Sequence, residues 1–163
     1  MHESRETAQA LEPDSIVDAV LSASRVLVAI AARSLADAGE DVTLTQYRAL
    51  VVLASRGAQT VADLAELLAV TPPTASRLCD RLVKKGLIRR RASQQDRRQV
   101  RIALSATGRE LIDAVTVRRR QEIGALMAPI PRETQVALVE ALARLAEAAG
   151  ETPEHEWSAG WDL

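Results

Sequence analysis

Aromatic residues and cysteine are scarce in this chain of 163 residues. It has no phenylalanine, one tyrosine, two tryptophans and one cysteine. A single cysteine excludes a disulfide within the chain. A core without phenylalanine must be built from leucine, valine, isoleucine and alanine, and such a core favours alanine-rich helices that pack closely.

The residue types that carry catalysis or bind metals are also few. The two histidines, His2 and His155, lie near the ends of the chain. With one cysteine they offer no metal cluster and no credible Ser-His-Asp set, and no glycine-rich phosphate loop is present. We therefore expect a protein that is not an enzyme and has no metal and no cofactor.

Signals for export or membrane insertion are missing as well. The N-terminal stretch MHESRETAQALEPD has mixed charge and no apolar centre, so it does not read as a signal peptide. The longest apolar stretches, such as residues 26–32, read as far too short to span a bilayer. With 47% hydrophobic and 26% charged residues, the chain is expected to be a single cytoplasmic domain over residues 1–163, without a membrane partner.

Charge is distributed unevenly, although the formal net charge is only −1. Between Arg77 and Arg101, ten basic residues stand against Asp80 and Asp96, which gives this block a net charge of +8. The segments on either side are both acidic. A basic block of this kind favours binding to a polyanion, although a charge run alone is also typical of a solvated face.

Apolar spacing predicts a mainly helical chain. Long helices are expected over residues 14–38, over 43–57, from Ser105 to the prolines at 129 and 131, and over 132–150. Two shorter helices are expected between them, from Thr60 and from Thr71 to Gly86. Thr60 and Asp63 form a capping-box pattern, and Thr71 precedes Pro72 as an N-cap.

The helix after Thr71 has two different faces. Ala75, Leu78, Cys79 and Leu82 point inward by spacing. The outward side chains are small or basic, which suits a helix that enters the major groove of DNA. Arg77 can reach a guanine edge, Thr74 and Ser76 can touch bases or phosphates, and Arg81 and Lys84 would meet the backbone.

A β-hairpin is expected directly after this helix. Residues 87–91 and 100–104 alternate as short strands, and the polar loop ASQQDRRQ lies between them. The order helix, helix, strand, loop, strand is that of a winged helix-turn-helix. The cations of the loop would then lie at the tip of a wing.

The chain resembles the MarR family of bacterial transcriptional regulators over roughly residues 14–150. The strongest carriers are RLCDRLVKKGLIRR at 77–90 and DRRQVRIALSATG at 96–108, which looks like the wing signature of the family. The resemblance implies that Asp96 braces the wing and that Arg98 enters a minor groove with Arg97 close by. A narrow minor groove has the negative potential that attracts such cations.

The resemblance also implies the organisation of the chain and its partners. Residues 43–104 would form the winged helix-turn-helix, residues 14–38 and 105–150 the dimerisation helices, and residues 151–163 an acidic tail with tryptophan. The function expected is a homodimeric regulator, a repressor relieved by a small molecule, on a pseudo-palindromic duplex. The candidate DNA-binding residues are Thr71, Pro73, Thr74, Ser76, Arg77, Arg81, Lys84, Ser93, Asp96, Arg97 and Arg98.

An effector pocket is the second candidate site. Family effectors, often phenolic or aromatic acids, bind between the dimer helices and the DNA-binding lobe, where Arg48 beside Tyr47 could hold a carboxylate. The alternative is that Tyr47 belongs to the core and Arg48 pairs with an acid. The scarcity of aromatic residues counts against an aromatic-lined pocket.

Several features keep two interpretations open. Cys79 is either a redox switch or a buried, inert thiol, and it is not near the first helix, where thiol sensors of the family carry their cysteine. The cluster at residues 118–120 is read as solvated surface or dimer salt bridges rather than as a DNA contact. Trp157 and Trp161 either belong to a disordered tail or pack on the body of the protein or its partner. A helical dimer that binds a protein partner is the alternative function.

Overall fold

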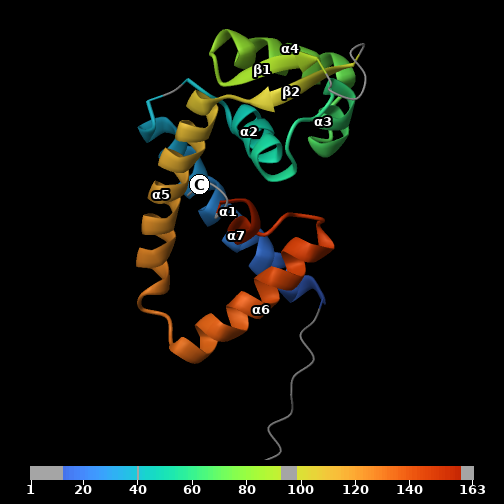
Figure 1. Cartoon of the computed structure of the whole chain (residues 1–163). Helices are drawn as coiled ribbons and strands as arrows, with labels where there is room; N and C mark the ends of the chain where they lie inside the picture. Colours follow the sequence, from blue (N-terminus) through green and yellow to red (C-terminus); the bar gives the residue numbers. More distant parts are fainter. Residues whose placement is uncertain (1–12, 40, 93–98, 159–163) are drawn as a thin grey trace, which may run out of the picture.

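The computed structural model describes residues 13–39, 41–92 and 99–158, and it is mainly helical with one two-stranded hairpin. A lobe of short elements lies at one end of the molecule, and α5 leads away from it towards α6 (Figure 1). The elements are α1 (Pro13–Asp37), α2 (Leu44–Arg56), α3 (Val61–Leu67), α4 (Pro72–Lys84), β1 (Ile88–Ala92), β2 (Val100–Leu104), α5 (Ala106–Met127), α6 (Arg132–Ala148) and α7 (Glu154–Ser158).

Local capping signals set the starts of the helices. The predicted capping box at Thr60 is confirmed, because its hydroxyl accepts from the Asp63 amide at 3.1 Å and the Asp63 carboxylate accepts from the Thr60 amide at 3.2 Å. Thr43 and Gln46 form the same arrangement at the start of α2. Gly39 and Gly57, both with positive φ, follow α1 and α2 as expected stops.

The start of α4 differs from an ordinary cap. Thr71 occupies the N-cap position, but its side chain makes no cap hydrogen bond to the backbone. The next two residues, Pro72 and Pro73, have no N–H to offer. The Thr71 hydroxyl instead lies 2.9 Å from the hydroxyl of Thr74, so the two side chains satisfy each other.

The hairpin is shifted by one residue from the prediction at its first strand. β1 covers Ile88–Ala92 and pairs antiparallel with β2, with Ile88 opposite Leu104 and Ala92 opposite Val100. The prediction that this strand begins at residue 87 is wrong, because the Leu87 amide still closes the turn after α4 by donating to the Leu82 carbonyl. The second strand matches the expected range, residues 100–104.

The junction between β2 and α5 is tightly packed. The Ser105 hydroxyl accepts from the Gly108 amide at 3.0 Å and donates to the Gly86 carbonyl at 2.7 Å. A β-carbon at Gly108 would collide with the Leu87 carbonyl and would lie 2.8 Å from Leu104 Cδ1. The Ser-x-x-Gly pattern therefore caps α5 and also seats it against the hairpin.

The core lies where α2, α4, the hairpin and the start of α5 meet. Cys79, Leu82 and Leu87 have no exposed surface there, and α5 contributes Ile112 and Val115. The four side chains of α4 predicted to face inward are all buried. By contrast, α6 has no buried residue, and valines and leucines on α1 and α6 are exposed.

The expectation about apolar length needs a correction at α1. By length and composition this helix is apolar enough to cross a membrane, with a mean hydropathy of 1.8 in its most apolar window. Residues 26–32 are only the densest part of an apolar stretch that covers residues 14–37. The residues between its large apolar side chains are more often alanine or serine than charged, so the mean hydropathy stays high.

The C-terminal tail contains a short helix that the sequence reading does not predict. α7 lies against α2, and Trp157 is only 8% exposed within the core cluster. The hypothesis that this tryptophan packs on the body of the protein is confirmed. Trp161 lies outside the described residues.

Candidate nucleic-acid interface

The outer face of α4 carries the side chains predicted to read DNA. Thr74, Arg77, Arg81 and Lys84 are exposed, whereas Ser76 is half-buried. This face lies opposite Ala75, Leu78, Cys79 and Leu82, so core packing orients it towards solvent. Thr71 and Pro73 are exposed at the start of the same helix.

A shallow hollow of about 350 Å³ lies between α4 and the start of α2. Arg77 and Arg81 line it from α4, and Thr45 of α2 and its N-cap residue Thr43 line it from the other side. These two threonines are not among the residues that the sequence predicts to bind DNA. The available signal was the Thr43–Gln46 capping-box pattern, because it marks a helix start, where the positive end of the helix dipole favours an anion.

Some of the clustered cations hold the lobe together instead of facing a ligand. Arg90 on β1 forms an ion pair with Asp80 on α4, which joins the hairpin to the helix. Lys85 reaches the carbonyl of Asp41, and Arg101 donates to the Ala58 carbonyl at 3.0 Å. Within the described part of the chain, Arg77, Arg81 and Lys84 form no ion pair, which leaves the cations of α4 available to a polyanion.

The tip of the wing stays a prediction. Ser93, Asp96, Arg97 and Arg98 lie outside the described residues. The strands that carry this loop are described, and Arg89 and Arg91 are exposed on β1 beside it.

Burial governs the chemistry of Cys79. Its side chain has no exposed surface. Burial raises the pKa of the thiol, and the nearby charge of Arg90 only opposes this effect. A raised pKa keeps the sulfur in its less reactive thiol form, which supports the interpretation of a structural cysteine.

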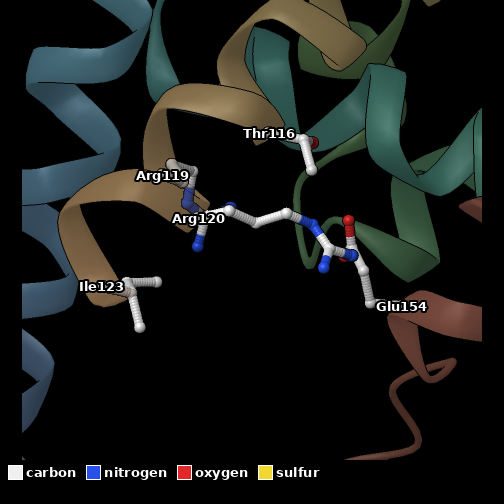
Figure 2. Close-up of a pocket in the computed structure, with 5 residues that line it drawn as sticks. All are labelled: Thr116, Arg119, Arg120, Ile123 and Glu154. Carbon is white, nitrogen blue, oxygen red and sulfur yellow. The ribbon is translucent and has the colours of Figure 1, made fainter. Parts of the chain in front are cut away.

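A second hollow lies between α5 and α7 and has a volume of about 290 Å³. Thr116, Arg119, Arg120 and Ile123 of α5 line it together with Glu154 of α7 (Figure 2). Arg119 is half-buried, so this part of the 118–120 cluster is not simply solvated surface. Sequence spacing gave no sign of this cavity, because Glu154 arrives from a distant part of the chain.

Tyr47 and Arg48 have different surroundings. Tyr47 is buried, and burial raises the pKa of its phenol, an effect that hydrogen bonding with Thr116 opposes. Arg48 makes two hydrogen bonds to the Glu151 carboxylate, at 2.8 and 2.5 Å. The alternative reading, a core tyrosine beside an arginine paired with an acid, is therefore confirmed.

A metal site receives no support from the described residues. Among positions 13–39, 41–92 and 99–158, no three histidine, cysteine, aspartate or glutamate side chains gather as metal ligands would.

The fold and the exposed face of α4 define a winged helix-turn-helix protein that binds DNA and regulates transcription. A sequence profile described as the MarR family matches residues 42–100. The crystal structure of Rv1404 from Mycobacterium tuberculosis superposes with a TM-score of 0.81 at 41% identity, covering 86% of this chain and 96% of that one. The chain belongs to the MarR family.

The names of two further similar proteins state a function or a bound ligand. The HTH-type transcriptional repressor MdtR of Bacillus subtilis is 29% identical over 117 residues, which are 72% of this chain and 75% of that protein. NadR, solved in complex with 4-hydroxyphenylacetate, is 27% identical with a TM-score of 0.61, covering 90% of this chain and 98% of that one.

Proposed function

We propose that this regulator is a homodimeric repressor that binds a pseudo-palindromic DNA site and releases it when a small organic anion binds. The observation that carries the proposal is the exposed face of α4, where Thr74 and Arg77 lie opposite a fully buried face. A two-fold dimer would place two such helices in successive major grooves, about 34 Å apart.

The residues of the proposed interface have distinct roles. Arg77 reads a base edge, and Thr74 and Ser76 contact bases or phosphates at the start of α4. Arg81 and Lys84 contact phosphates along the backbone, with Thr71 and Pro73 at the entrance of the groove. Ser93, Asp96, Arg97 and Arg98 form the wing tip, where the two arginines enter the minor groove.

The dimer interface is proposed on α1, α5 and α6. On α6, Val136, Val139, Leu142 and Leu145 are all about half exposed or more. A soluble protein rarely leaves such a stripe in water, and a second copy of the chain would cover it. On this proposal residues 43–104 bind DNA, residues 14–38 and 105–150 form the dimer, and the apolar length of α1 serves the interface, so the protein is cytoplasmic and needs no membrane.

The effector site is proposed at the hollow between α5 and α7. Arg119 and Arg120 supply positive charge, Thr116 a hydroxyl and Ile123 an apolar wall. This lining suits a small carboxylate that has an apolar body. The presence of 4-hydroxyphenylacetate in the NadR structure supports this class of ligand. The proposal includes no catalytic activity and no cofactor.

The test begins with selection of DNA sites from a random duplex library, because the natural site need not be known. Binding of the selected duplex is then measured by fluorescence anisotropy over a salt series for the wild type and for Arg98→Ala. We expect affinity to fall steeply with salt, with a slope of about −0.9 per phosphate neutralised, and Arg98→Ala to reduce the slope. No enrichment and no salt-dependent binding would refute the proposal and favour a dimer that binds a protein partner.

A further inference from the structure

The chain does not end on α6 but returns to the DNA-binding lobe. Residues 150–157, which we call the C-terminal strap, run from the end of α6 to α2. Arg56 donates to the Gly150 carbonyl at 2.5 Å, Arg48 holds the Glu151 carboxylate with both terminal nitrogens, and Trp157 is buried in the core cluster. The strap is therefore attached to the lobe at three points, Gly150, Glu151 and Trp157.

This attachment closes a ring of elements. Figure 1 shows α5 leading away from the hairpin, α6 turning back across the base of the molecule, and α7 lying near α2. α6 has no buried residue of its own. The lobe is thus joined to the C-terminal helices at the junction of Ser105 and Gly108, through the core packing of Ile112 and Val115 of α5, and again through the strap.

The two attachments differ in kind. At the first junction the chain runs directly from β2 into α5, and Gly108 packs so closely on Leu87 that no atom could be added there. The strap depends on Trp157 and on a pair of charged side chains that are both partly exposed, 45% for Arg48 and 36% for Glu151. Water and salt screen such a pair, so it exchanges far more readily than a packed core contact.

The strap also borders the hollow described above. Glu154 is part of its wall, opposite Arg119 and Arg120 (Figure 2). The strap thus places an acidic side chain of the chain itself beside cations, in the position where an incoming anion would have to bind. A bound anion and the docked strap would therefore compete for the same arginines.

We propose that the C-terminal strap is a releasable latch: when docked it holds α2, and with it α4, in the placement that DNA requires, and its release lowers affinity for DNA without unfolding the lobe. This inference rests on the proposed DNA-binding function. A two-fold site demands a fixed spacing of the two α4 helices, and a lobe that has lost the strap keeps its packing on α5 but has one restraint fewer on α2. Apparent affinity falls in proportion to the fraction of molecules in the competent placement.

The experiment uses the full-length chain with Trp161→Phe, so that Trp157 is the only tryptophan. Glu151→Gln is compared with Glu147→Gln, which makes the same change of charge on exposed α6. Acrylamide quenching of Trp157 reports docking, and anisotropy on the selected duplex reports affinity. We expect Glu151→Gln to increase quenching and to weaken DNA binding, each by no more than about fivefold, with dimer mass and helical content unchanged.

A triple variant, Glu151→Gln with Glu154→Gln and Trp157→Ala, removes two carboxylate charges and the buried indole from the strap, which keeps the proposal falsifiable. If the triple variant, still folded and dimeric, binds DNA within twofold of the parent chain, or more tightly, the latch is refuted. If the parent chain itself binds no duplex, the proposed function fails instead, and quenching still shows whether the strap is docked. Weaker binding by the released variants alone supports the latch.

Discussion

The DNA-binding lobe and the long outer helices differ in what covers their apolar side chains. In the lobe, residues such as Leu82 and Ile102 have no exposed surface. On α6, Val139 is 70% exposed, although that helix is also amphipathic. The apolar side chains of the lobe are therefore covered within the chain, whereas α6 has an apolar face that the chain itself leaves exposed.

One chain can therefore contain two sources of stability. The lobe gains stability from contacts within the chain, which do not depend on concentration. The outer helices would gain it by association, so their contribution depends on protein concentration. Substitutions in the two regions should therefore produce different kinds of defect.

The largest expected effect is on the outer helices. Val139→Asp puts a charge on the exposed apolar stripe of α6 twice per dimer. Each apolar side chain buried is worth roughly 1.5–3 kcal/mol, so we expect dimerisation to weaken by at least about 3 kcal/mol, roughly a hundredfold. Sedimentation velocity over a concentration series measures this change.

Ala137→Asp is the matched control for that variant. Ala137 is exposed on α6 and lies about 160° around the helix from Val139, so it introduces the same charge away from the stripe. Equal dimerisation of the two variants would show that the stripe is not the interface.

Next in size is the effect of Arg77→Ala on DNA binding. If Arg77 reads a base, its loss should weaken binding by roughly 1–3 kcal/mol and relax specificity at one position of the site. Anisotropy with the selected duplex and single-base variants measures both effects. Arg144→Ala on α6 is the control, and a loss of the same size there would contradict a specific role for Arg77.

A defect of stability alone is expected at the junction of the two regions. Gly108→Ala should destabilise the fold by roughly 1–3 kcal/mol, because the added methyl group overlaps the Leu87 carbonyl. Urea denaturation measures the change. Gly124→Ala is the control, because no atom lies within 4 Å of the added carbon, and it should stabilise the fold slightly. An equal loss of stability at both positions would show that close packing at Gly108 is not the cause.

The smallest effect concerns pH and the strap. The hydrogen bonds from Arg48 hold the pKa of Glu151 below its usual range. The stabilisation is therefore present above the unfolded pKa of about 4.3 and is lost as pH falls through the lower folded value. The pair is partly exposed, so it is worth less than about 1 kcal/mol.

Melting temperatures of the wild type and Glu151→Gln, measured between about pH 6 and pH 3, test this prediction. The difference between the two proteins should be present at the upper end and shrink towards zero at the lower end. A difference that is constant over the series would show that the carboxylate charge of Glu151 does not matter.

Local signals predicted much of the fold. The capping residues Thr60 and Ser105 and the stop at Gly86 depend on contacts over three or four residues, and these are visible in sequence. The inward face of α4, Cys79 included, followed from helical spacing in the same way.

Long-range pairing was not predictable. Arg48 and Glu151 are 103 positions apart, and Glu154 lines the same hollow as Arg119 only because α6 reverses the chain. Neither residue has a neighbour in sequence that indicates its partner. The start of β1 likewise depends on the hydrogen bond that the Leu87 amide donates to the Leu82 carbonyl, which the sequence does not indicate.

The paired prolines at the start of α4 limit what the helix backbone can offer to DNA. Of residues 72–74, only Thr74 has a backbone N–H, so this helix end offers few amides to a phosphate, unlike most helix starts. What α4 brings to DNA is therefore carried mainly by its side chains rather than by its backbone amides. On the proposed function, the general attraction of α4 for a duplex depends on Arg81 and Lys84, and discrimination between sequences depends on Arg77.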